Sequence, residues 1–134
     1  MWHVISTEQD LRYLMEKTYG FHDSCLKELS YVSGAYVDDE LWMRPVNDQR
    51  SLRVVIQRQF KEDPVIELEF SGLHHLLLRP VDESYTCEIL DATLLLTQDR
   101  VYWCDCGGLT EETIPDYHGT VICASKLRWR SIPR

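Results

Sequence analysis

The chain has 134 residues, of which 44% are hydrophobic and 27% are charged, and its formal net charge is -8. This length and composition are typical of one globular domain covering residues 1–134, and they exclude a disordered or fibrous chain. A surface with 22 acidic and 14 basic residues repels a phosphate backbone, so we expect no nucleic-acid partner.

The N-terminal region predicts one amphipathic helix. In STEQDLRYLMEKTYG, residues Ser6 to Gln9 give a helix start signal, Leu11, Leu14 and Met15 have helical spacing, and Gly20 gives a stop signal. The start MWHVISTEQD lacks the basic and apolar regions of a signal peptide, and no apolar run approaches the ~20 residues of a membrane span. We therefore expect a cytoplasmic protein without a membrane partner.

After Gly20 the hydrophobic period changes to two, which predicts strands. LRVVIQRQF and VIELEFS alternate apolar and polar residues, and KEDP at residues 61–64 supplies the turn of a hairpin. The other predicted strands are Leu26–Val32, Tyr36–Met43, Leu73–Arg79, Thr86–Thr97, Val101–Cys104 and Val121–Trp129. Because no second long helical pattern occurs, the fold class is α+β, a mainly antiparallel curled or two-layer sheet with one N-terminal helix.

The stretch FHDSC lies between the helix and the first long strand. His22 and Asp23 are candidates for a general base and the carboxylate that orients it. Neighbouring side chains on an extended segment point to opposite faces, so a catalytic pair would need partners from elsewhere in the chain. The alternative is a structural junction at which these polar residues bind the backbone, and this is the interpretation that we favour.

Cysteines and one histidine suggest a possible metal or redox site. Cys104 and Cys106 lie on either side of Asp105, and His118 follows in the same region. Structural zinc sites usually have ligand pairs separated by two to four residues on knuckle-like turns, whereas Cys104 and Cys106 are separated by only one residue. We therefore predict no cofactor, and we expect the five cysteines to be reduced thiols.

Two groups of residues are candidates for binding a partner. In the last predicted strand, basic Lys126, Arg128 and Arg130 alternate with Leu127 and Trp129, which gives one basic and one apolar face. If this is an edge strand, the basic residues either prevent uncontrolled pairing, the interpretation that we favour, or anchor a partner together with the tryptophan. The acidic run Asp38, Asp39 and Glu40 falls in a predicted loop or turn, where it is either a solvated turn, the interpretation that we favour, or a negative surface for a basic protein partner.

The residues FHDSCLKELSY, followed two strands later by ELEFSGLHHLLL, resemble small bacterial domains of unknown function. The resemblance covers roughly residues 20–105, and its distinctive residues are His22, Asp23 and Ser24. Some similar domains are encoded beside toxin genes and are thought to be immunity proteins that bind and neutralise the toxin. The resemblance implies a non-enzymatic, single-domain binding protein.

Three functional hypotheses follow from these patterns. The leading one is a bacterial protein-binding module, because the chain is acidic and contains no common catalytic motif. The second is a small hydrolase or metal-dependent enzyme built around His22 and Asp23. The third is a self-associating structural domain that forms a homodimer through an edge strand or an apolar sheet face.

Overall fold

The computed structural model describes residues 1–133, and its N-terminal part contains the predicted helix. Strand β1 (His3–Ile5) leads into helix α1 (Glu8–Lys17), which is followed by the short 3-10 helix η1 (Tyr19–Phe21). Thr7 caps α1: its hydroxyl accepts the Asp10 amide at 3.1 Å, and the Asp10 carboxylate accepts the Thr7 amide at 3.0 Å. The cap is therefore Thr7, one residue after the serine of the predicted start signal, and the helix begins at Glu8.

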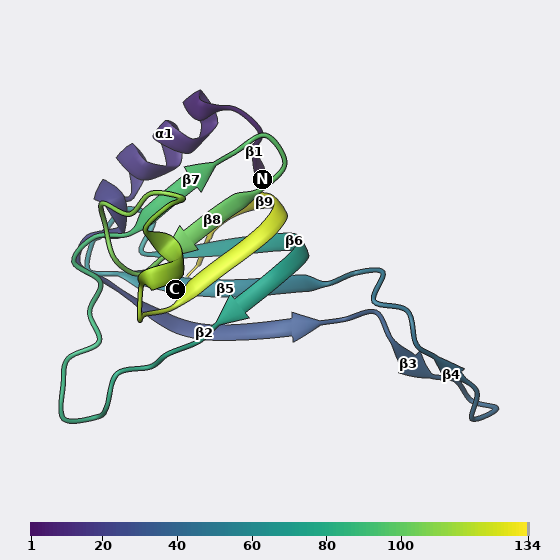
Figure 1. The fold of residues 1–134 in the computed structure, drawn as a ribbon. Coiled ribbons are helices and arrows are strands. Elements are labelled where there is room, and N and C mark those ends of the chain that lie inside the picture. Colours follow the sequence, from purple (N-terminus) through teal and green to yellow (C-terminus); the bar gives the residue numbers. More distant parts are fainter. Residues whose placement is uncertain (134) are drawn as a thin grey trace.

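The remaining chain forms an antiparallel sheet, which confirms the predicted fold class. The sheet has the order β2-β5-β6-β9-β8-β7, with β1 also paired to β9, and α1 lies beside it (Figure 1). Its strands are β2 (Ser24–Val32), β5 (Ser51–Arg58), β6 (Val65–Leu77), β7 (Thr93–Leu96), β8 (Val101–Cys104) and β9 (Val121–Ile132). A second, two-stranded sheet is formed by β3 (Tyr36–Val37) and β4 (Met43–Arg44), and η2 (Ile114–Asp116) precedes β9. Within residues 1–133, no helix is long and apolar enough to span a membrane.

The core lies between α1 and one face of the sheet. The alternating residues of β5 and β6 that the sequence assigns to one face are all fully buried, namely Leu52, Val54, Ile56, Ile66, Leu68 and Phe70. Leu14 of α1 and the large aromatic side chains Trp103 and Trp129 join the same cluster. Burial of a side chain of this size stabilises the fold by about 1.5–3 kcal/mol, so the period-two pattern of the sequence determines which sheet face the helix covers.

Several strand predictions are corrected by the structure. The predicted strand Tyr36–Met43 is instead a hairpin of two short strands, and of the predicted strand Thr86–Thr97 only Thr93–Leu96 is a strand. The predicted strands on either side of Gly72 form one continuous strand, β6, because both pair with β9. Gly72 adopts φ 63° and passes close to Ser125 of β9, where a side chain would clash. Strand β1 was not predicted, since three residues are too short to show a period.

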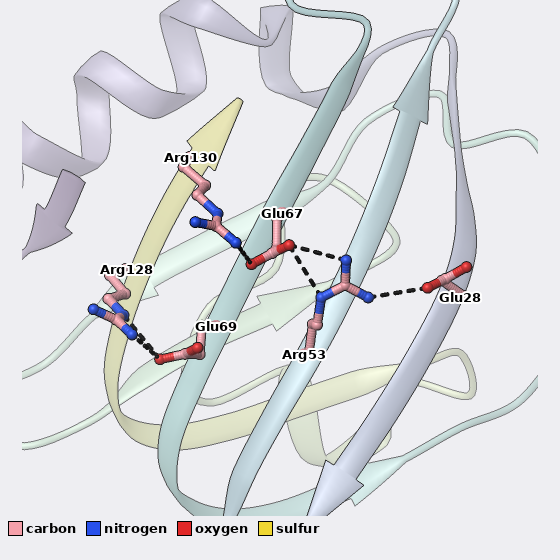
Figure 2. Close-up of polar contacts among 6 residues, drawn as sticks. All are labelled: Glu28, Arg53, Glu67, Glu69, Arg128 and Arg130. Atoms are coloured by element: carbon pink, nitrogen blue, oxygen red, sulfur yellow. Dashed lines mark hydrogen bonds and ion pairs between the residues drawn. The ribbon is translucent and has the colours of Figure 1, made fainter. Parts of the chain in front are cut away.

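The face of the sheet opposite the core carries a network of ion pairs (Figure 2). Glu67 is only 3% exposed, and its carboxylate accepts Arg53 Nη2 at 2.9 Å and Arg130 Nη2 at 3.1 Å. Arg53 also binds Glu28 at 3.0 Å, and Arg128 binds Glu69 at 2.7 Å. The two arginines pair with the buried Glu67 carboxylate, which would destabilise the fold if it were buried without a partner.

We predict that Glu67→Ala lowers the free energy of unfolding by about 2 kcal/mol, because it leaves two arginines without their shared, water-excluded partner. The matched control is Glu28→Ala, which removes another carboxylate from the same Arg53. Since the Glu28 side chain is 59% exposed, we expect a loss below about 1 kcal/mol. Urea unfolding monitored by tryptophan fluorescence measures both values, and equal losses would contradict this assignment.

Candidate functional site

A hairpin projects from the sheet between β2 and β5, and we call residues 33–50 the arm (Figure 1). Its base is held by backbone bonds: the Ser33 carbonyl accepts the amides of Gln49 and Arg50, each at 3.1 Å. The Arg50 guanidinium donates to the Leu73 carbonyl of β6 at 3.2 Å, and the Leu73 amide donates back to the Arg50 carbonyl. The direction in which the arm leaves the body is therefore fixed by the sheet.

The tip of the arm is organised by Asp38. Its carboxylate accepts the amides of Glu40 and Trp42 at 3.0 Å and binds the guanidinium of Arg44 at 3.1 Å. Such bonds from an aspartate to nearby amides stabilise a turn. Of the three acidic candidates on the arm, Asp38 thus has a structural role, whereas Asp39 and Glu40 are exposed.

Large apolar side chains on the arm are open to solvent. Leu41 is 84% exposed and Trp42 66% exposed, and the others are Tyr36, Val37, Met43 and Val46. Leu41 also has φ 68°, a left-handed conformation that is strained for a leucine. Contiguous exposed apolar residues mark interaction sites, and strained residues are common at functional sites. Sequence reasoning missed these residues because their alternation resembles that of a strand packed in a sheet.

The candidates on the last strand occupy different places from those expected. Strand β9 is central rather than at an edge, because β6 pairs along one side of it and β1 and β8 along the other. Trp129 is 2% exposed and stacks on His3 at 4.3 Å, so it belongs to the core and cannot anchor a partner at the surface. The guanidinium groups of Arg128 and Arg130 lie over the Trp2 ring at 4.1 and 4.3 Å and bind glutamates, while Lys126 is exposed.

The FHDSC stretch is a junction between three segments. The Asp23 amide donates to the Ile89 carbonyl, the Ile89 amide donates to the Ser24 carbonyl, and the Gln59 amide donates to the Asp23 carbonyl. Residues 19, 20, 21 and 23 all have φ between 51° and 65°. Three of these four are not glycine, and each costs about 1–3 kcal/mol. The buried Phe21 ring, which packs edge-on against Trp103 at 6.0 Å, and the hydrogen bonds offset this strain.

His22 and Asp23 lie together at the surface of this junction. His22 Nδ1 is 2.7 Å from the Leu90 carbonyl, and Nε2 is 3.4 Å from the Asp23 carboxylate. The pKa of His22 is raised by the bond to Leu90, then by the charge of Asp23, with smaller contributions from Asp91 and Glu88. Nδ1 thus ties the ring to the 89–92 segment and Nε2 contacts the neighbouring Asp23, and both contacts support the structural interpretation.

The candidates for a metal or redox site differ in their exposure. Cys104 is buried in β8, whereas Cys106 and His118 are exposed. Burial, with smaller contributions from the charges of Asp105 and Cys106, raises the pKa of Cys104 to about 12. Among the described residues, no three His, Cys, Asp or Glu side chains are positioned to hold a metal ion.

We predict that His22 stabilises the fold at acidic pH. A histidine whose folded pKa is raised above its unfolded value contributes stability that is fully present below the unfolded pKa, near 6.5, and lost as the pH rises through the folded pKa. Replacing it by His22→Gln should therefore remove stability at pH 5.5 and have a smaller effect at pH 8.5, as measured by thermal unfolding. A loss that is the same at both pH values would contradict the prediction.

We also predict a fixed order of thiol reactivity. At pH 8, iodoacetamide should label the exposed Cys87 and Cys106 first, while Cys104 and Cys123 react only when the chain unfolds, because both are buried. Mass spectrometry of the digested protein measures each rate. Adding Zn²⁺ should leave the labelling of Cys106 unchanged, and protection of Cys106 by zinc would revive the metal hypothesis.

The chain matches no protein-family model, no curated protein and no solved structure. Among the described residues, the arm carries the largest set of exposed apolar side chains on one ordered element.

Proposed function

We propose that the protein is a cytoplasmic bacterial protein-binding module and that the arm carries the binding surface. The exposed apolar side chains on an ordered hairpin support this proposal most strongly. Tryptophan and tyrosine are the residues most enriched at binding hot spots, and Trp42 and Tyr36 of the arm are 66% and 60% exposed. A hairpin pre-ordered by Asp38 loses little conformational entropy on binding.

The charge of the arm supports a basic partner. Residues 33–50 include four acidic and two basic residues, and Arg44 is already paired with Asp38. The exposed carboxylates of Asp39 and Glu40 lie beside Leu41 and Trp42, so apolar contact and charge attraction act on the same partner surface. Such charges increase the rate of association more than they increase affinity. A toxin-neutralising immunity protein that covers a basic toxin is the form of this function that we propose.

We predict that Trp42→Ala weakens binding to the partner at least tenfold, since loss of a hot-spot tryptophan costs about 2 kcal/mol or more. The partner is first isolated from the protein's own cells with the tagged chain and identified by native mass spectrometry, and affinity is then measured with the purified pair. The Trp42 side chain is exposed and lies outside the core, so the variant should unfold at an unchanged temperature.

The contribution of charge is tested by the double variant Asp39→Lys and Glu40→Lys. Its matched control is Glu111→Lys and Glu112→Lys, which changes the net charge equally at two exposed positions on another loop. Slower association in the arm variant alone would support the proposal. If neither Trp42→Ala nor the arm charge reversal alters the affinity, the arm is not the binding surface. A chain that captures only its own copies would favour a homodimer instead.

A further inference from the structure

Strand β2 has a free edge that continues into the arm. It is the first strand of the sheet order and pairs with β5 along one side. On its other side, the described chain meets it at one isolated bridge, between Ser24 and Ile89. From Leu26 to Val32 the outward backbone amides and carbonyls of β2 therefore have no strand partner among residues 1–133. Such an edge is a template for the addition of another strand.

Acidic segments flank both ends of this edge. The arm leaves from the C-terminal end of β2, and the loop between β6 and β7 projects near its N-terminal end (Figure 1). Residues 78–91 of that loop include four acidic residues and one basic residue, and their exposed apolar side chains are Leu78, Val81, Tyr85 and Leu90. An added strand would thus run between two acidic and apolar projections.

A cleft of about 410 Å³ is lined by Leu26 of β2, by residues of this loop and by Asp105, Tyr117 and Thr120. Leu26, Val81 and Ile89 supply apolar walls, and Glu88 and Asp105 supply carboxylates. The remaining charged wall residue, Arg79, donates to the Tyr117 carbonyl at 2.9 Å. The side chains of a strand alternate between its two faces, so those on one face of an added strand would enter this cleft.

The acidic residues at both ends of the β2 edge favour a basic segment over a second copy of this chain. A second copy of the chain carries the same net charge of -8, and antiparallel pairing of two β2 edges would place the acidic arm of one copy against the acidic loop of the other. The bulge in β2 between Leu26 and Glu28 also interrupts the register that such self-pairing needs. A basic segment is instead attracted from both ends of the edge.

We propose that β2 accepts an extended segment of a basic protein as an added strand, with apolar side chains in the cleft and basic side chains facing the flanking carboxylates. This inference rests on the proposed function and specifies its binding mode and the chemistry of the partner. Main-chain hydrogen bonds supply the affinity in this mode, and the alternating side chains supply the specificity.

The test uses a synthetic peptide of about nine residues that alternates lysine and valine and is blocked at both ends. Hydrogen exchange of the whole protein is followed by mass spectrometry and NMR with and without saturating peptide. We expect at least tenfold slower exchange of the outward amides between Leu26 and Val32, and unchanged exchange in the central strands β6 and β9. A peptide with glutamate in place of lysine should not bind.

Two N-methylated peptides separate strand addition from side-chain docking. One is methylated at the backbone nitrogen of every lysine and the other at that of every valine. Because alternate residues of a strand direct their amides to the same edge, each peptide keeps its side chains but loses the hydrogen-bond donors along one of its two edges. Strand addition predicts that one peptide keeps its affinity and the other loses it at least tenfold. Equal affinities, absence of binding, or bound peptide without slower β2 exchange would overturn the inference.

The outcomes also separate this inference from the proposed function. Slower exchange confined to the arm would overturn strand addition while leaving a protein-binding arm intact. Slow exchange of the outward β2 amides in the protein alone, together with a dimer in analytical ultracentrifugation, would assign the edge to a second copy and overturn the inference. Failure of the proposed function is detected independently, when arm variants keep full affinity for the captured partner.

Discussion

The pairing of β6 with β9 is the interaction on which the rest of the fold depends. Its register runs from Val65 opposite Ile132 to Leu77 opposite Val121, and it joins the β2-β5-β6 half of the sheet to the β9-β8-β7 half. Strand β9 also holds β1, and through β1 it places the helix over the core. Because these strands are far apart in sequence, the pairing closes a long loop and must be stabilised by its side chains on both faces.

The two faces of this pair meet that requirement in different ways. On the inner face Leu68 lies opposite Trp129, and both are buried in the core. On the outer face Glu67 lies opposite Arg130 and Glu69 opposite Arg128, so opposite charges face each other across the strands (Figure 2). Cross-strand pairs of both kinds stabilise a sheet, and together they specify one register. These charged side chains therefore pair with one another and stabilise the sheet.

The arm differs from the rest of the molecule because its apolar residues do not contribute to the core. Two residues suffice to connect adjacent antiparallel strands, yet β2 and β5 are joined by residues 33–50. The arm is ordered by hydrogen bonds of Asp38 at its tip and of Arg50 at its base, while Leu41 and Trp42 remain in water. Exposed apolar groups on a soluble domain favour aggregation unless a partner covers them, so their presence on an ordered element supports the proposed binding function.

The sequence by itself determined the helix, the sheet class and the buried face of β5 and β6, because these follow from local capping and from the alternation of apolar residues. It also indicated that FHDSC is a junction. Only the tertiary structure decided that Trp129 is in the core and Trp42 is at the surface, since both lie in alternating segments and differ in whether a neighbouring strand and helix cover them. Strand order and the free edge of β2 were likewise beyond sequence reasoning, because they arise from contacts between segments that are distant along the chain.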